Sequence, residues 1–398
     1  MARVRLLILT HNFPRFTGDF AGVFISLLAR RLHEFDIDPV VLAPHDPGAS
    51  EFENIENITV YRFRYADHDE DETIAYRGNM HQLVLGSVTG IFKFKQFLDA
   101  YRKAAFTVIE KEKIEAVSAN WLVPSGIVLK TIAARTRLPL VLSSHGTDIR
   151  LMTKYLGISR HYFKSLFPRL HRWTVVSSFL RDEIVGLEPS IAPILEILPL
   201  PHDESIFYPD SSIKRDPKLI VAVTRFTEQK RVDFLIRALA LVADKQPQSR
   251  LDIYGSGPLQ PQIESLIAKF GLQERVRIMR PVPQSELRVV YNSAGMVVLN
   301  SFHEGFGLAL SEAMLCSAPV IGTASGGIVD IVRDRETGLL VPVDNAEALA
   351  GAMLALMSDD NLRNSLADEG HCFAQNTYAS GKLAARFAAI VRQSLVGK

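Results

Sequence analysis

The chain alternates, along its whole length, short apolar runs rich in β-branched residues with longer amphipathic stretches. This alternation is typical of parallel sheets, since each strand of such a sheet needs helices to cover its faces. We expect six strands in the first half, at 4–10, 39–43, 58–62, 116–119, 140–144 and 173–176. Six more are expected at 219–223, 251–254, 276–279, 296–299, 319–323 and 338–341. The pattern therefore predicts an α/β chain with two doubly wound sheets.

A length of 398 residues also favours two domains, because a single core of that size is uncommon. Pro199, Pro201 and Pro209 interrupt regular structure near the middle of the chain. We place a linker at 199–213, between domains at 1–198 and 214–377. The tail, 378–398, follows a break near 376–378 and has the pattern of an amphipathic helix.

The composition excludes several classes of protein. A hydrophobic content of 47% and a charged content of 22% are ordinary for a globular chain, and a net charge of +1 gives no field to recruit nucleic acid. Cys316 and Cys372 cannot supply a disulfide framework or a zinc site by themselves, so a cytoplasmic location is the simplest expectation. The apolar run at 4–10 is short for a signal peptide, and no run is long enough to span a membrane.

Two carboxylates stand eight residues apart around a glycine-containing turn. Glu304 precedes Gly305, Phe306 and Gly307, and Glu312 follows inside an expected helix, about two turns in. The first N–H groups of a helix are unpaired and the helix dipole attracts anions there, so the backbone of 305–307 can receive a diphosphate. A carboxylate on either side can accept hydrogen bonds from sugar hydroxyls, which predicts a nucleotide-sugar site.

This segment resembles the E-x7-E signature of the retaining, metal-independent glycosyltransferases of family 4, also called glycosyl transferases group 1. Further matches to the family follow in the same order along the chain: an R-x4-K element from Arg225 to Lys230, a glycine turn at 254–259, and the stretches 319–321, 325–327 and 337–342. The resemblance implies the GT-B architecture, in which two Rossmann-like domains face each other across a cleft. It also implies that the last helix, within 378–398, crosses back to pack on the N-terminal domain.

The same resemblance implies the reaction. The chain is expected to move a sugar from a UDP-, GDP- or ADP-sugar to a carbohydrate or polyprenyl-diphosphate-linked acceptor, without a metal or other cofactor, in the assembly of cell-surface polysaccharide or glycolipid. The N-terminal domain would bind the acceptor and the C-terminal domain the nucleotide sugar. Fixed cations must then stabilise the departing diphosphate.

Arg225 and Lys230 are expected to bind the donor diphosphate, Arg225 as a planar fork and Lys230 as a mobile point charge. The family places Glu304 against the hydroxyls of the donor sugar and Glu312 against those of the ribose. Gly255 and Gly257 would let the backbone approach the nucleotide closely, although a plain turn explains a G-x-G equally well.

In the N-terminal half, the sequence 143–148 is similar to the family's H-G-x-D element. The family places His145 near the donor sugar and the reacting centre, and Asp148 could equally cap the helix that follows. The loop containing Gly18 resembles the family's first glycine loop, beside the diphosphate and the acceptor. Here Asp19 and Phe20 stand between glycines that are often adjacent, which weakens a phosphate contact for Gly18.

Two charged stretches admit a functional and a structural explanation. The segment 149–181 is basic and aromatic with no acidic residue before Arg181, so it could lie on an anionic membrane as an amphipathic helix, or its aromatics could be core. A membrane role would place the enzyme peripherally on the cytoplasmic face of the inner membrane. The acidic run 67–72 contains D-x-D triplets of the kind that bind metals in other transferases, but we expect a solvated loop.

Three other functions compete with transfer. A nucleotide-sugar epimerase can share the two-lobed architecture, and a non-catalytic protein can bind a sugar nucleotide. A dinucleotide oxidoreductase would need G-x-G-x-x-G after a strand, but Gly255 and Gly257 are followed by Pro258 and then by Gln260.

Overall fold

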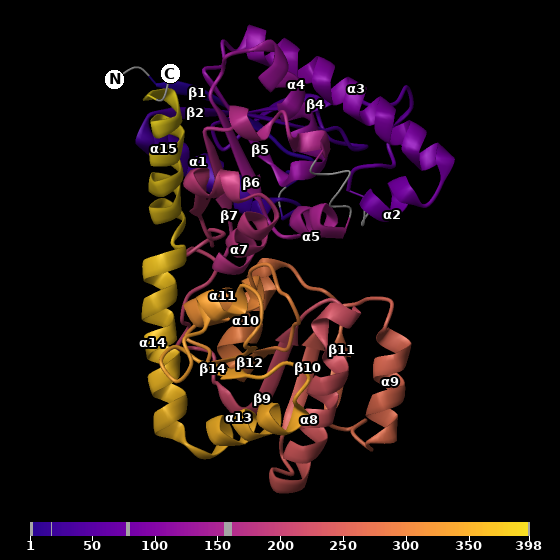
Figure 1. The fold of residues 1–398 in the computed structure, drawn as a ribbon. Helices are drawn as coiled ribbons and strands as arrows, with labels where there is room; N and C mark the ends of the chain where they lie inside the picture. The colour runs from indigo at the N-terminus through magenta and orange to yellow at the C-terminus, as the bar shows by residue number, and fades with distance from the viewer. Residues whose placement is uncertain (1–2, 17, 77–79, 155–160, 397–398) are drawn as a thin grey trace. The chain divides into compact units, whose positions relative to one another are not determined.

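A computed structural model describes residues 3–16, 18–76, 80–154 and 161–396 (Figure 1). The chain forms two compact units. The first contains Met1–Val176, Leu180–Pro201 and Ser380–Lys398, and the second contains Ser177–Phe179 and His202–Ala379. The chain therefore passes between the units several times, and the last passage returns it to the first unit.

The first unit is built on an eight-stranded sheet with the order β3-β4-β2-β1-β5-β6-β7-β8. Its strands are β1 (Val4–Leu9), β2 (Ile37–Pro44), β3 (Phe52–Ile55), β4 (Ile58–Phe63), β5 (Ala116–Asn120), β6 (Leu140–Ser144), β7 (Arg172–Val175) and β8 (Leu195–Ile197). Its helices include α1 (Val23–Leu32), α2 (Met80–Leu85), α3 (Val88–Lys111), α4 (Ile127–Arg135), α5 (Thr147–Lys154) and α15 (Ser380–Val396), and α7 (Ser178–Leu187) begins in the second unit. Neighbouring strands are parallel except β3, which is antiparallel to β4.

Strand β1 is the centre of this sheet. Leu6 lies opposite Pro39 of β2 and Ala116 of β5, so the chain continues from β1 first to one side and later to the other. In open α/β sheets, ligands bind beyond the carboxyl ends of the strands at such a reversal. A ligand site in this unit is thus expected at the loops that follow β1, β5 and β6.

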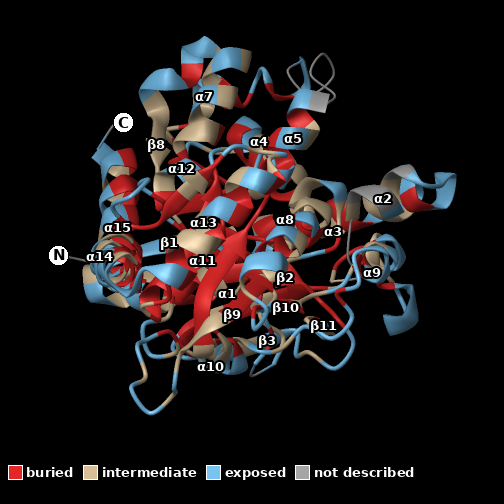
Figure 2. Ribbon diagram, turned by 90° about the horizontal axis from the view of Figure 1, so that it is seen from below, coloured by how far each residue is buried: buried red, intermediate tan, exposed pale blue. Residues whose placement is uncertain are grey.

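The C-terminal helix belongs to the first core, as the resemblance implied. Leu383 and Phe387 of α15 share a buried cluster with Leu6, Ile25 and Ala29, and α15 packs beside α1 (Figure 1). The opposite side of the sheet carries α3, where Phe97 and Tyr101 pack against Phe63. Buried residues accordingly concentrate in the strands and the inner faces of the helices (Figure 2).

The second unit contains a six-stranded parallel sheet with the order β11-β10-β9-β12-β13-β14. The strands are β9 (Asp216–Val223), β10 (Arg250–Tyr254), β11 (Val276–Met279), β12 (Ala294–Leu299), β13 (Val320–Thr323) and β14 (Leu339–Val341). The helices are α8 (Val232–Lys245), α9 (Gln260–Lys269), α10 (Gln284–Ser293), α11 (Leu308–Leu315), α12 (Ile328–Ile331), α13 (Ala346–Ser358) and α14 (Asp360–Tyr378). Together with the first sheet, this confirms the predicted α/β class with two doubly wound domains.

The segment predicted as a linker is partly packed. The first unit's segment Leu180–Pro201 ends here, and from His202 to Ala379 the chain belongs to the second unit. Phe207 is buried, and the Asp210 carboxylate pairs with Arg288 Nη1 at 2.7 Å. The prolines do interrupt regular structure, but an apolar side chain and an ion pair hold the stretch against α10.

The basic segment 149–181 is not one continuous helix. Helix α5 ends at Lys154, and β7 occupies Arg172–Val175 as an interior strand of the sheet. Phe167 stacks on Trp173 with ring centroids 5.7 Å apart, and both are buried, so the core explanation holds for these aromatics. Tyr155, which belongs to the same prediction, lies outside the described residues. Within the described ranges, every helix is too short or too polar to traverse a bilayer.

Candidate functional site

The residues predicted to bind a donor gather at the carboxyl edge of the second sheet. Arg225 and Lys230 follow β9, Glu304 follows β12, and Gly255 follows β10. The carboxyl ends of parallel strands share one edge, so loops far apart in sequence meet there. One edge of one sheet thus presents cations, carboxylates and a helix N-terminus.

Lys230 and Glu304 form an ion pair, in which the Lys230 ammonium donates to Glu304 Oε2. The two side chains are 18% and 16% exposed, so solvent reaches the pair only partly. The backbones of the same loops are joined as well: Phe302 N donates to Gln229 O at 2.8 Å, and Gln229 Nε2 donates to His303 O at 3.0 Å. These contacts therefore fix the loops after β9 and β12 to each other.

Gly326 and Gly327, which follow β13, lie directly against the backbone of the Glu304 loop. Gly327 N donates to Glu304 O at 2.7 Å. A Cβ on Gly326, whose φ is +62°, would lie 2.2 Å from the same carbonyl oxygen, and a Cβ on Gly327 would lie 2.5 Å from Gly305 O. These glycines matched the family pattern, but the sequence assigned them no role. The structure shows that only glycine lets this backbone lie so close to the backbone of Glu304 and Gly305.

Helix α11 begins directly after the glycine turn. Gly307 has φ 122° and ψ 49°, a conformation that glycine reaches without strain, and Leu308 is the first helical residue. Glu312 is consequently little more than one turn inside the helix, not about two turns as expected, because the loop after Glu304 is longer than anticipated. Phe306 is 4% exposed, so its side chain anchors the turn and leaves the backbone to face a ligand.

The Glu312 carboxylate is buried, with 6% of the residue exposed. Tyr291 Oη donates to its Oε2 at 2.9 Å, and Gln284 Nε2 lies 3.5 Å from Oε1. Burial raises the pKa of Glu312 to about 7, against the opposing effect of these two donors. Tyr291 was not foreseen, and the buried aromatic position in an amphipathic helix gave no sign that its hydroxyl would hold a carboxylate.

Arg225 is exposed, and within the described ranges its side chain has no hydrogen bond or ion pair. The turn with Gly255 and Gly257 lies directly against the loop that carries it. A Cβ on Gly255 would lie 1.8 Å from Thr224 O, and a Cβ on Gly257 would lie 2.5 Å from Phe226 O. These glycines therefore fit the backbone of the Arg225 loop, which is a supporting role.

In the first unit, His145 lies at the end of β6. Its Nε2 is 3.1 Å from Asn120 Oδ1, and its ring is 4.6 Å from that of Trp121. The ring's Nδ1 is buried without a hydrogen-bond partner among the described residues. Burial lowers the pKa of His145 to about 3, so the imidazole is neutral at physiological pH. Asp148 lies inside α5, and its carboxylate accepts the backbone N–H groups of His145 and Leu122, which ties two loops together.

Three residues beside His145 were missed. His11 follows β1, Asn120 ends β5, and Trp121 comes next; the His11 and Trp121 rings are 4.5 Å apart. Each stands at the carboxyl end of a predicted strand next to the reversal of strand order. The rule that ligands bind at that point could have identified them.

Gly18 is exposed, and a Cβ on it would meet nothing within 4 Å. The neighbouring backbone is held by Arg15, whose guanidinium pairs with Asp19 and Asp46 at 2.7 Å each. Gly22 is the glycine that sterics require in this loop, since a Cβ there would lie 2.2 Å from Asn12 O and its φ is +66°.

Only part of the acidic run 67–72 is solvated. Glu72 is fully buried, and its Oε2 lies 2.5 Å from His45 Nδ1. His45, Asp69 and Glu72 place ligand atoms within 4.8 Å of one another, as a metal site would. Asp69, however, already pairs with Arg64, and the short contact between His45 and Glu72 leaves no room for an ion between them.

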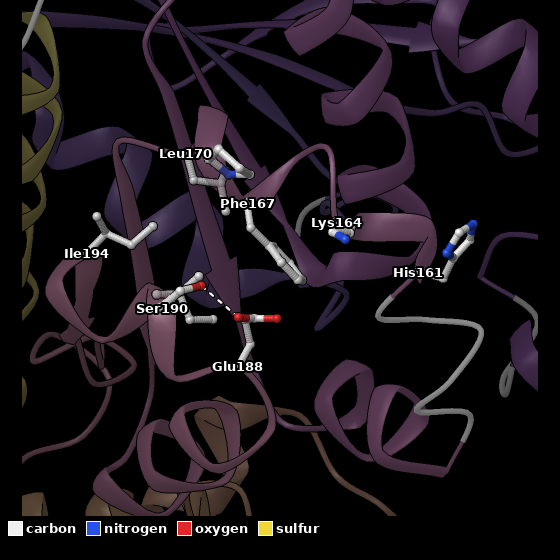
Figure 3. Close-up of a pocket in the computed structure, with 9 residues that line it drawn as sticks. His161, Lys164, Phe167, Leu170, Glu188, Ser190 and Ile194 are labelled. Atoms are coloured by element: carbon white, nitrogen blue, oxygen red, sulfur yellow. Dashed lines mark hydrogen bonds between the residues drawn. The ribbon is translucent and has the colours of Figure 1, made fainter.

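The first unit also has an open cavity of about 810 Å³ on its surface (Figure 3). His161 and Lys164 line one side, and Glu188 and Ser190, joined by a 2.7 Å hydrogen bond, line another. The buried ring of Phe167 contributes to the wall. None of the predicted site residues lines this cavity.

Comparison with known families covers both halves of the chain. The model of "Glycosyltransferase Family 4" matches residues 21–194, and that of "Glycosyl transferases group 1" matches residues 204–371. An uncharacterised glycosyltransferase of Methanocaldococcus jannaschii is 25% identical over 382 residues, with 90% of each chain covered. The N-acetyl-alpha-D-glucosaminyl L-malate synthase of Bacillus anthracis is 22% identical, with 75% of this chain and 80% of that protein covered.

Solved structures agree on the fold. Sucrose-phosphate synthase from Thermosynechococcus elongatus superposes with a TM-score of 0.81 at 21% identity, and all of both chains is covered. Anabaena HepE in complex with UDP-glucose gives 0.72 at 15% identity, again over all of both chains. At these identities the likeness establishes architecture, and the chemistry of this chain must be argued from its own residues.

Proposed function

The chain is a glycosyltransferase with the GT-B fold, and from that premise we propose that it transfers a sugar from a nucleoside-diphosphate sugar to a hydroxyl of a carbohydrate or lipid-linked acceptor, with retention of anomeric configuration. The proposal includes the residues assigned above to the donor, in the second unit. We also propose that the transfer needs no metal ion.

The observation that carries the proposal is the ion pair of Lys230 with Glu304, beside the N-terminus of α11 and the exposed Arg225. A diphosphate needs donors and positive charge, which Arg225, Lys230 and the backbone of 305–307 supply together. A sugar needs hydrogen-bond acceptors for its hydroxyls, and Glu304 is one. A nucleotide sugar carries both requirements in adjoining groups.

The ion pair also suggests how a donor would be received. A diphosphate carries more negative charge than one carboxylate, so it would draw the Lys230 ammonium toward itself. The Glu304 carboxylate would then be left to accept hydrogen bonds from hydroxyls of the bound sugar. Exchange of partners within one pair thereby joins recognition of the phosphate to recognition of the sugar.

In the transfer step the bond from the sugar C1 to the phosphate oxygen breaks, and its electrons stay on the departing diphosphate. Arg225 and Lys230 stabilise that charge in place of a metal ion. We propose front-side attack: the acceptor hydroxyl adds to C1 through an oxocarbenium-like state and passes its proton to the leaving phosphate. Glu304 is assigned no nucleophilic role, because its proposed part is to accept hydrogen bonds from the sugar hydroxyls once Lys230 has moved to the diphosphate. We assign His145 a hydrogen bond near the reacting centre.

The acceptor is proposed to be a growing cell-surface glycan or a polyprenyl-diphosphate-linked sugar, met at the cytoplasmic face of the inner membrane. Two surface features of the first unit support an anionic or lipid-borne acceptor. His161 and Lys164 line the open cavity, and Val88, Ile91 and Phe92 of α3 are exposed apolar side chains. Sedimentation with anionic vesicles at low and high salt tests this part alone, since binding that persists on neutral vesicles would exclude a role for the cations.

The donor assignment is tested by thermal shift with UDP, GDP, ADP and their sugar conjugates, on the wild type and on Arg225→Ala with Lys230→Ala. A ligand that binds only the folded state raises the melting temperature, so one nucleotide should stabilise the wild type and not the double variant. Equal stabilisation of both proteins would overturn the proposed diphosphate site.

Two further readouts separate transfer from its alternatives. Nucleoside diphosphate released only when an acceptor is present indicates transfer, whereas conversion of the donor sugar without release indicates an epimerase. The anomeric configuration of the product, read by NMR coupling constants, then tests retention.

A further inference from the structure

We propose that His202 is a positioning residue for the donor loop, holding the start of α11 and the Gly305–Gly307 turn in place through Ser311 and Phe306. The proposal rests on the proposed function in so far as it concerns donor binding. His202 is the first residue of the second unit and is 2% exposed. It stands in the segment predicted to be a linker, and the sequence assigned it no role there.

A hydrogen-bond chain runs from the imidazole to the first residue of α11. His202 Nε2 lies 2.7 Å from Ser311 Oγ, and Ser311 Oγ donates to Leu308 O at 3.0 Å. Because the serine hydrogen is committed to Leu308, the imidazole must be the donor and carry its hydrogen on Nε2. Ser311, the middle member of this hydrogen-bond chain, directly precedes Glu312, whose carboxylate is predicted to meet the ribose.

The imidazole keeps this form throughout the useful pH range. Burial lowers the pKa of His202 to about 3, so the ring stays neutral. Among the described residues packed against it, Ser311 is the hydrogen-bond partner and Phe207, Phe306 and Tyr378 are the aromatic neighbours. None of these neighbours is charged at neutral pH. The His202 ring therefore keeps donating its hydrogen bond to Ser311 across this pH range.

The ring also packs against the side chain that anchors the glycine turn. The His202 and Phe306 rings are nearly parallel, at 27°, with centroids 6.5 Å apart. Tyr378 meets both edge-on, with its centroid 5.9 Å from that of His202 and 5.6 Å from that of Phe306. One side chain thus bonds to the helix and packs against the loop immediately before it.

The backbone of His202 joins two segments that lead to the other unit. Its N–H donates to Tyr378 O at 3.1 Å, and it forms a β-bridge with Ala379. Pro201 before it and Ser380 after Ala379 belong to the first unit. Through His202, the donor loop is therefore attached to both of the segments that connect the second unit to the first.

A packing role alone does not explain a histidine here. Burying a polar ring costs free energy that only a hydrogen bond offsets, and phenylalanine would fill the same space without that cost. The geometry thus points to the donated hydrogen as the reason for the residue.

The test compares His202→Gln, His202→Phe and Ser311→Ala in the full chain. Glutamine can place a donor near the former Nε2, whereas phenylalanine keeps the bulk and removes the donor. We expect His202→Phe to raise the KM for the donor and the Kd for its nucleoside diphosphate about tenfold, since a buried hydrogen bond is lost at the loop. His202→Gln should recover most of the affinity, and the KM for the acceptor should stay within about twofold.

Ser311→Ala should match His202→Phe, and the double variant should be no weaker than either single one, because one chain of hydrogen bonds is broken in each case. Leu349→Ala, in the core of the same unit, is the matched control: it lowers the melting temperature but should leave the donor KM unchanged. A donor KM that follows the melting temperature across all five variants would reduce His202 to a packing residue.

Hydrogen exchange on the unliganded proteins makes the test independent of the donor assignment. Amides of 305–311 should exchange faster in His202→Phe than in Leu349→Ala at equal loss of stability. Unchanged exchange there overturns the positioning role, even if no nucleotide binds. A wild type that shows protected amides but binds no nucleotide contradicts the proposed function and leaves the positioning of the loop supported.

Discussion

The Lys230 ammonium donates a hydrogen bond to Glu304 Oε2, which joins two loops 74 residues apart in the chain. This pair sets the resting state of the candidate donor site. Both partners are largely shielded from solvent, so removing one withdraws a charge-assisted hydrogen bond from the other. Substitutions at the two ends should therefore have different consequences.

Lys230→Ala should weaken nucleoside-diphosphate binding by about 10- to 100-fold, as one charge-assisted contact to phosphate is removed. Glu304→Gln should leave that affinity unchanged or tighten it, because the ammonium loses its competing partner, while kcat falls by tenfold or more. Calorimetry with the nucleotide and steady-state rates measure the two effects. Equal loss of nucleotide affinity in both variants would contradict the exchange of partners.

Glu312 should make stability depend on pH. Its folded pKa of about 7 lies above the ordinary value of 4.5, so the folded state holds the proton more tightly than the unfolded chain. This contribution is fully present below about pH 4.5 and is lost as the pH rises through 7, with a total of about 3 kcal/mol. Melting temperatures at pH 5 and pH 8 should differ less in Glu312→Gln than in the wild type. Identical differences in both would exclude Glu312 as the titrating group.

Gly326→Ala should disable the Glu304 loop. The new Cβ would lie 2.2 Å from Glu304 O at a φ of +62°, so the loop must shift, at a cost of roughly 2–4 kcal/mol. Donor affinity should fall together with the melting temperature. Gly351→Ala is the control, since this glycine lies in α13 with open space around it, and alanine there should stabilise by about 0.5–1 kcal/mol.

Asn120→Asp should make activity depend on the protonation of His145. A carboxylate in place of Asn120, whose Oδ1 lies 3.1 Å from His145 Nε2, stabilises the imidazolium and raises the pKa of His145 from its present value of about 3. Activity should then be low at acidic pH and recover as the pH rises. Asn120→Ala should lower kcat without a new acidic limb in the pH–rate profile, and a limb in the alanine variant would show that another group titrates.

The twelve predicted strands all occur, and most of them are buried apolar runs whose composition distinguishes them from the helices around them. Strands β3 and β8 were missed. They lie at the two edges of the first sheet, where one neighbour suffices and partly exposed side chains are tolerated, so the apolar signal is weak.

The candidate site was predictable where chemistry depends on a motif. Arg225, Lys230 and Glu304 stand on adjoining loops as the family pattern implied. Tyr291 and His202 were not predictable, since their role depends on which side chain they face in three dimensions. The prolines near residue 200 predicted an interdomain linker at 199–213; in the structure the second unit begins at His202, with Phe207 buried and Asp210 in an ion pair.

The packing of α15 in the core of the first unit affects how the chain folds while it is being synthesised on the ribosome. The sheet of the first unit is complete in sequence at Ile197, but the helix that covers its α1 face, Ser380–Val396, is translated only after the whole second unit. The second unit has all its residues by Ala379 and can finish first. A nascent or C-terminally shortened chain therefore exposes the apolar surface of the domain made earliest, and would depend on chaperones for longest at its N-terminal half.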